Sequence, residues 1–95
     1  MSDGQMTLRL RVHGRVQGVW FRAWCVEQAT SLGIAGWVRN RRDGTVEIVA
    51  RGAAASMREL ARRCRRGPPA ARVERVDEES ATDLIPPGFR TLPTA

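Results

Sequence analysis

The chain has 95 residues, 27% of them charged, and its formal net charge of +6 comes from arginine because the sequence contains no lysine. This length supports one domain with one hydrophobic core, and no stretch approaches the ~20 apolar residues of a membrane span. The positive charge suits nucleic acid, an acidic surface or a small anion and does not choose among them.

Hydrophobic periodicity predicts the elements of the first half of the chain. Alternating apolar and polar residues predict a strand over about 7–13, and helical spacing of apolar residues predicts a helix over about 22–32. Gly33 follows as a left-handed cap. Strands over about 35–40 and 45–50 flank Asp43-Gly44, a pair typical of a tight hairpin turn.

The second half of the chain reads as a helix, a strand and a loop-like segment. The helix over about 53–66 has a core stripe at Met57, Leu60, Ala61 and Cys64, and Gly67-Pro68-Pro69 ends it. A fourth strand over about 71–78 needs a bulge, because Val73 and Val76 cannot otherwise share one face. Phe89 is the candidate for a short closing strand or an anchor.

This order, β-α-β-β-α-β, predicts an α+β ferredoxin-like two-layer sandwich with two helices on one face of an antiparallel or mixed sheet. We expect one domain over 1–95, with tails at 1–6 and 92–95. The first two strands are joined by a helical crossover, so they should run parallel and end at the same edge of the sheet.

Segment 14–22 reads G-R-V-Q-G-V-W-F-R and joins the first predicted strand to the first predicted helix. Gly14 and Gly18 let the main chain curl so that successive N–H groups point at one centre, a shape that suits an anion. The helix start adds free N–H groups and the positive end of its dipole. Arg22 could hold two phosphoryl oxygens with its guanidinium fork. We interpret this segment as a phosphate-binding loop.

A second segment, 36–47, reads G-W-V-R-N-R-R-D-G-T-V-E. Together the two segments resemble the acylphosphatase family, whose signatures read approximately G-x-V-Q-G-V-x-F-R and G-x-V-x-N-x-x-D-G-x-V-E, at every fixed position. The order of elements over about 7–90 also fits. The resemblance implies a hydrolase that cleaves acyl phosphates to a carboxylate and inorganic phosphate, with no metal, no cofactor and no phosphoenzyme.

The same resemblance implies roles for two side chains: Arg22 binds the phosphate, and Asn40 orients the attacking water. The loop residues should bind the phosphate mainly through the main chain; they are Arg15, Val16, Gln17, Gly18, Val19, Trp20 and Phe21. Trp20 occupies a variable position of the signature, and its side chain is either a partial lid or a surface aromatic.

Other residues of the two segments have structural interpretations. Gln17 is interpreted as a hydrogen-bonding loop residue, and Asp43 and Gly44 as turn residues. Glu47 is expected to pair across strands with an arginine of the first strand.

The residues themselves favour the same chemistry, because the candidate site holds N–H donors, Arg22 and Asn40 but no general acid. Phosphate monoesters expel a poor alkoxide, which usually calls for an acid or a metal. An acyl phosphate expels a carboxylate whose conjugate acid has a pKa of roughly 4, so it needs no proton at neutral pH. A site that only binds phosphate and positions water therefore suits a mixed anhydride.

Cysteine and histidine are too few for a zinc site, and no metal site is expected. Cys25 and Cys64 fall on inward helix faces and are interpreted as reduced core thiols. His13 ends the first strand on its polar face and is interpreted as a surface residue rather than a catalytic base.

The expected partner is a small-molecule acyl phosphate, with inorganic phosphate as product and inhibitor. The sequence start lacks the features of a signal peptide, so we expect a cytoplasmic location. We also expect a monomer without a membrane or nucleic-acid partner. One alternative is RNA binding, since ferredoxin-like domains include RNA-recognition modules and arginines crowd the second helix; however, no aromatic platform lines the central strands. The other alternative is an inactive anion-binding regulatory domain.

Overall fold

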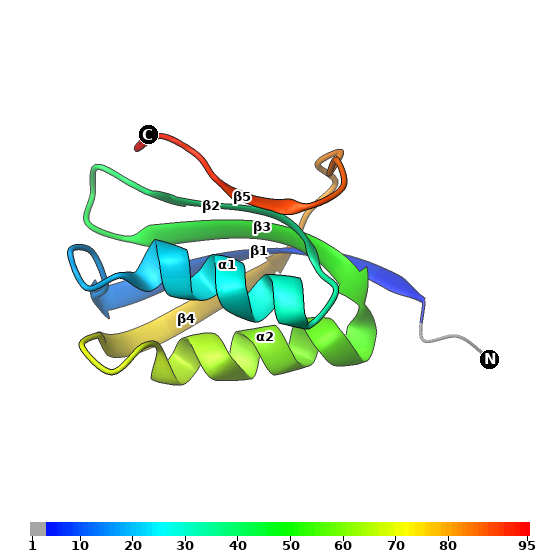
Figure 1. The fold of residues 1–95 in the computed structure, drawn as a ribbon. Helices are drawn as coiled ribbons and strands as arrows, with labels where there is room; N and C mark the ends of the chain where they lie inside the picture. The colour runs from blue at the N-terminus through cyan, green and yellow to red at the C-terminus, as the bar shows by residue number, and fades with distance from the viewer. Residues whose placement is uncertain (1–3) are drawn as a thin grey trace.

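The computed structural model describes residues 4–95. Two helices pack on one face of a five-stranded sheet (Figure 1), which confirms the predicted ferredoxin-like sandwich. The elements in chain order are β1 (Gln5–Arg15), α1 (Phe21–Ser31), β2 (Ala35–Asn40), β3 (Val46–Ala53), α2 (Ala54–Arg66), β4 (Arg72–Ser80) and β5 (Phe89–Thr91). No helix in this part of the chain is long and apolar enough to span a membrane.

The strands lie in the order β4-β1-β3-β2-β5. Both β1 and β2 run antiparallel to β3, which lies between them, so β1 and β2 are parallel to each other. The short β5 adds a parallel partner to β2, which makes the sheet mixed. Phe89 therefore begins a fifth strand.

The register places the ends of β1 and β2 at one edge of the sheet. Val46 of β3 pairs with Val12 of β1 on one side and with Asn40 of β2 on the other. Figure 1 shows the loop after β1 and the β2–β3 hairpin at the same end of the sheet. The expected meeting of the two signature segments is therefore present at the level of the backbone.

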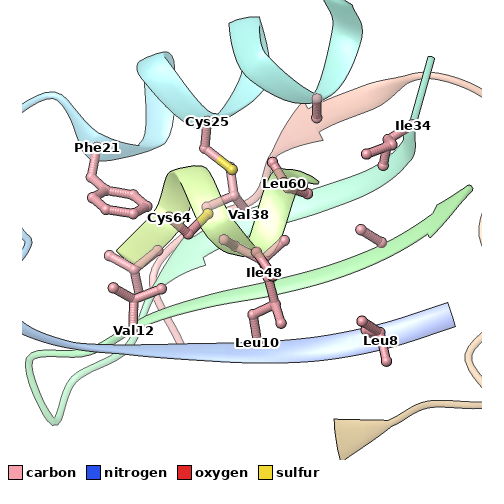
Figure 2. Close-up of a cluster of buried hydrophobic side chains, with 14 of the residues drawn as sticks. Leu8, Leu10, Val12, Phe21, Cys25, Ile34, Val38, Ile48, Leu60 and Cys64 are labelled. Carbon is pink, nitrogen blue, oxygen red and sulfur yellow. The ribbon is translucent and has the colours of Figure 1, made fainter. Parts of the chain in front are cut away.

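The core lies between the sheet and the two helices. The predicted stripe of α2 is buried, and α1 buries Phe21, Cys25 and Ala29 against it. Figure 2 shows the sulfur atoms of Cys25 and Cys64 facing each other between the helices. Both cysteines are free thiols in the core, as predicted.

Two strands are longer than their local sequence pattern indicates. β1 begins at Gln5, inside the segment 1–6 predicted as a tail, because Gln5 pairs with Ala53 at the far end of β3. Periodicity within one strand does not report a partner some fifty residues away. β3 likewise ends at Ala53, three residues beyond the predicted strand over 45–50. The remaining boundaries differ from the predicted ones by at most two residues, as helix and strand ends commonly do.

A bulge interrupts the pairing of β1 with β4 between His13 and Gly14. It lets Val73 and Val76 both lie half-buried, as the sequence pattern required. A Cβ at Gly14 would lie 2.2 Å from the Arg72 carbonyl oxygen, and the φ angle of Gly14 is 124°. Glycine at this position therefore permits the chain to leave the sheet where the loop begins.

The segment 92–95, predicted as a tail, runs beside β2. Leu92 donates a main-chain hydrogen bond to the Val38 oxygen (2.9 Å), and Ala95 donates one to the Asn40 oxygen (3.0 Å). Arg42 in turn donates to the Ala95 oxygen (2.8 Å). These bonds hold the main chain on both sides of Asn40.

Candidate active site

The loop 16–20 leads from β1 into α1. Gly18 (φ 73°) and Trp20 (φ 66°) both adopt left-handed conformations, and Trp20 is the N-cap of α1. The first helical hydrogen bond runs from Trp24 N–H to the Trp20 oxygen (3.0 Å), so the N–H groups before Trp24 in α1 have no helical acceptor. Alternation of left- and right-handed residues at a helix start forms an anion-binding nest.

Several side chains in and next to this loop are buried. Val16, Val19 and Phe21 are buried in the core, so these residues can offer only their main chain. Arg15, which was predicted as part of the loop, is the last residue of β1, is exposed and pairs with Arg72 in the sheet.

Arg22 is the second residue of α1 and is half-buried. The first turn of α1 contains no acidic residue. Within residues 4–95, no carboxylate lies within ion-pair distance of the Arg22 guanidinium. A cation at the positive end of a helix dipole without a counterion is unfavourable, and an external anion would relieve it.

A cavity of about 450 Å³ opens beside the loop. Its one charged lining residue is Arg22; the others are Val16, Gly18, Trp20, Phe21, Ala23 and Thr91. The cavity therefore combines a guanidinium and main-chain donors with an apolar wall.

The Gln17 side chain joins the loop to the β2–β3 hairpin. Its Nε2 donates to the Arg41 oxygen at 2.7 Å and to the Thr45 oxygen at 2.8 Å. These two acceptors lie on either side of the hairpin turn, directly after Asn40 and directly before Val46. The expected role of Gln17 as a loop hydrogen-bonding residue is confirmed, and the bonds fix the loop relative to the end of β2.

Asn40 is the last residue of β2 and is half-buried. Its main-chain oxygen accepts a hydrogen bond from Ala95. Its side-chain amide has no hydrogen-bond partner within the described chain and is not among the fully buried polar atoms. Asn40 does not line the cavity that contains Arg22, so the structure brings it to the same edge of the sheet but not into that cavity.

The hairpin after Asn40 is held by its own side chains. The Asp43 Oδ1 atom accepts hydrogen bonds from Thr45 N (3.0 Å) and from Thr45 Oγ1 (2.6 Å), which lower the pKa of Asp43. Gly44 has a φ of 94°. Asp43 and Gly44 are therefore turn residues, as predicted.

Glu47 lies on the sheet face away from the helices and binds three arginines. Its carboxylate accepts hydrogen bonds from Arg9 (3.0 Å), Arg39 (2.9 Å) and Arg41 (3.2 Å), and its side chain is 5% exposed. Burial alone would raise the pKa of Glu47, but the Arg39 hydrogen bond and the nearby positive charges lower it overall. The predicted pairing with a first-strand arginine is confirmed with Arg9.

The other singled-out side chains lie outside this site. His13 is on the open sheet face and its Nε2 atom lies 2.9 Å from Asp77 Oδ2, consistent with a surface role. On α2, Arg62 and Arg63 pair with Glu59, and Arg65 pairs with Glu78 of β4. Sequence reasoning missed Thr91 as a cavity residue, because only the parallel pairing of β5 with β2 brings it there.

The fold and this site together define a ferredoxin-like α+β protein in which Arg22 and free helix N–H groups lie where the first strand joins the first helix. Comparison with known proteins narrows the class. The acylphosphatase family model matches residues 8–91, so the chain belongs to the acylphosphatase family.

Individual proteins that are similar to this chain are also acylphosphatases. The chain is 56% identical over 86 residues to an acylphosphatase of Rhizorhabdus wittichii, covering 90% of this chain and 87% of the relative. It is 51% identical to an acylphosphatase of Rhodospirillum rubrum, covering 93% and 97% of the two chains. The solved structure of an acylphosphatase from Coxiella burnetii superposes with a TM-score of 0.88 at 35% identity, covering 93% of each chain.

Proposed function

We propose that this chain hydrolyses the carboxyl–phosphate anhydride bond of acyl phosphates, with Arg22 and Asn40 as its catalytic side chains. The observation that carries the proposal is the half-buried Arg22 guanidinium, which has no carboxylate partner within residues 4–95 and lines a cavity beside the loop 16–20. Membership of the acylphosphatase family supports the reaction type.

The loop and Arg22 would bind the phosphoryl group. Main-chain N–H groups at the start of α1 can donate to its oxygens, and the guanidinium fork can neutralise the charge spread over them. The Gln17 hydrogen bonds restrain the loop that carries these donors before the substrate arrives. Fixed donors stabilise the transition state without reorganisation at the moment of reaction.

Asn40 would hold the attacking water. Its side-chain amide offers both a donor and an acceptor and does not titrate. Within the described chain this amide has no hydrogen-bond partner. Gln17 and the Ala95 hydrogen bond restrain the main chain around it. Since Asn40 lies outside the Arg22 cavity, the water would approach from the β2 side of the bound phosphoryl group.

The carboxylate leaving group explains why this set of residues is sufficient. Its departure needs no proton at neutral pH, because the conjugate acid has a pKa of roughly 4. We therefore expect hydrolysis that a chelator does not reduce, and far lower activity on aryl phosphate esters. Inorganic phosphate, the product, should inhibit competitively.

The same proposal includes a monomeric enzyme that acts on a small-molecule substrate. Among residues 4–95 the exposed large hydrophobic side chains are Trp20 and Leu84, which offer no extended apolar patch for a stable partner. The cytoplasmic location stays a prediction.

The proposal is tested by measuring hydrolysis of benzoyl phosphate by the wild type, Arg22→Ala, Asn40→Ala and Arg58→Ala. Removing one fixed oxyanion donor costs about 10²–10³ in rate, so the first two variants should lose at least that much activity. Arg58 is an exposed arginine of α2 and serves as the control, with wild-type activity expected. Circular dichroism and thermal unfolding confirm the fold of each variant. A wild-type rate no higher than that of Arg22→Ala would overturn the proposal.

A further inference from the structure

Trp20 is an exposed aromatic residue at the mouth of the Arg22 cavity. Its side chain is 82% exposed, although its neighbours Val19 and Phe21 are buried in the core. An exposed indole gains little from the folded state by burial. The core therefore does not explain why a tryptophan occupies this position.

The backbone of Trp20 points to the same conclusion. Within residues 4–95 it is the one residue other than glycine with a positive φ, 66°. Bulky side chains rarely adopt this conformation, and strain of this kind concentrates at ligand-binding sites. The conformation makes Trp20 the N-cap of α1 and places its side chain at the cavity that Arg22 lines.

The cavity is larger than a phosphoryl group requires. Its volume is about 450 Å³, whereas a protein cavity of about 150 Å³ holds a benzene ring. Apart from Arg22, its wall consists of Trp20, the small Ala23, Thr91 of β5 and main chain or side chains of the loop. Space and apolar surface therefore remain beside the Arg22 guanidinium for the second half of the substrate.

We propose that Trp20, with Ala23 and Thr91, forms the binding site for the acyl group, and that its indole selects aromatic and large apolar acyl phosphates over acetyl phosphate. This inference rests on the proposed function, because the acyl group is placed relative to a phosphoryl group bound by Arg22 and the loop. Aromatic rings stack on an indole face with an offset or edge-on geometry, and a methyl group offers much less contact area. Trp20 is then a specificity residue that leaves the water attack itself unchanged.

The test compares kcat/KM for benzoyl phosphate and acetyl phosphate in the wild type, Trp20→Asn and Trp20→Phe. Asparagine is chosen because it tolerates a left-handed backbone, so the loop keeps its shape. We expect the benzoyl-to-acetyl ratio to fall about two- to tenfold in Trp20→Asn, the range of an aromatic contact, and to recover in Trp20→Phe. The loss should appear as a higher KM for benzoyl phosphate at nearly constant kcat, the signature of binding lost equally from the ground state and the transition state.

Two further measurements separate this role from a structural one. The inhibition constant of inorganic phosphate, which has no acyl group, should stay unchanged in Trp20→Asn. Calorimetry with the non-hydrolysable benzoylphosphonate and acetylphosphonate should show the same loss of selectivity without turnover. Leu84→Ala removes the other large exposed apolar side chain of residues 4–95, which does not line the cavity, and should leave the ratio at its wild-type value.

The possible failures are distinguishable. A wild type that hydrolyses neither acyl phosphate would overturn the proposed function. A wild type that hydrolyses both, with a benzoyl-to-acetyl ratio that Trp20→Asn leaves unchanged, would overturn the role of Trp20 alone. An equal loss for both substrates, together with weaker inhibition by phosphate, would also overturn it by showing that Trp20 merely shapes the loop.

Discussion

Arginine side chains at the loop edge and on the open face of the sheet differ in what neutralises them. On the open face, Arg9, Arg39 and Arg41 converge on the buried carboxylate of Glu47. At the loop edge, Arg22 has no carboxylate partner within residues 4–95, and the first turn of its helix has no acidic residue. The charge at one site is satisfied internally, and the charge at the other is available to a ligand.

This difference shows why the number of arginines in the chain says little about its function. An arginine that already binds a buried carboxylate has fewer donors left for phosphate, and much of its field is cancelled. Other arginines without a carboxylate partner, such as Arg58 and Arg66, are exposed, whereas Arg22 is half-buried and has main-chain donors beside it. The contrast can be tested by changing one arginine or its carboxylate at a time.

The largest expected effect comes from Arg22→Lys, which keeps the charge but removes the fork. Lysine supplies a point charge and cannot bind two phosphoryl oxygens in the same plane. We expect kcat/KM for benzoyl phosphate to fall by about 10²-fold, as for loss of an oxyanion donor. Arg39→Lys, on the open face, should change it less than about twofold. Similar losses in both variants would contradict the contrast between the two sites.

Glu47→Gln should chiefly reduce stability. The substitution leaves three half-buried arginines without their shared counterion. Because these arginines are 26–32% exposed, water relieves part of the penalty, and we expect a loss of about 2 kcal/mol in the free energy of unfolding. For a domain of this size that lowers Tm by roughly 10 °C. Glu74→Gln, at an exposed position of β4, is the control and should leave Tm unchanged.

A smaller effect is expected from Gln17→Met, which removes the link between the two halves of the site while keeping side-chain length. The Arg41 and Thr45 oxygens lose their shared donor, and the loop is free to shift relative to Asn40. We expect kcat for benzoyl phosphate to fall by about tenfold, since small displacements of positioning groups reduce rates strongly. The inhibition constant of inorganic phosphate should change by a smaller factor than kcat. Unchanged kcat would show that the loop holds its place without Gln17.

The smallest expected effect is that the contribution of Glu47, on the open face of the sheet, to the stability of the fold depends on pH. The pKa of Glu47 is lower in the folded protein than its ordinary value of 4.5, so its ion pairs stabilise the fold above that pH. This contribution is lost as the pH falls through the lowered pKa. The difference in Tm between the wild type and Glu47→Gln should therefore shrink on acidification from pH 7 to pH 3. A difference that grows would reverse the sign of the predicted linkage.

Local sequence patterns predict the parts of the structure that depend on near neighbours. The periodicity of α2 predicts its buried stripe, and Asp43-Gly44 predicts the hairpin turn. The crossover rule, applied to the first two strands, predicts that Asn40 and the loop meet at one edge. Each of these inferences needs only the alternation, the turn chemistry or the handedness of a short segment.

Contacts between distant segments could not be predicted in the same way. In register, Glu47 lies opposite Arg11 of β1 and Arg39 of β2. Its carboxylate bonds Arg39 but also Arg9 and Arg41 in place of Arg11, because long side chains reach diagonal neighbours. Thr91 reaches the cavity through a parallel pairing that no local pattern indicates. Trp20 has a positive φ, which single-sequence propensities do not predict for a bulky residue.

The facing thiols of Cys25 and Cys64 give the fold a built-in reporter. A hydrogen bond with Cys64, together with burial, raises the pKa of Cys25 well above its usual range, so the reactive thiolate is suppressed while the helices stay packed. Because both cysteines are fully buried, an alkylating reagent can reach these sulfurs only when the core under α1 and α2 opens. The rate of alkylation therefore reports how often the core under α1 opens, and the first turn of that helix carries Arg22. If added phosphate binds both this turn and the loop, the rate of cysteine alkylation should fall.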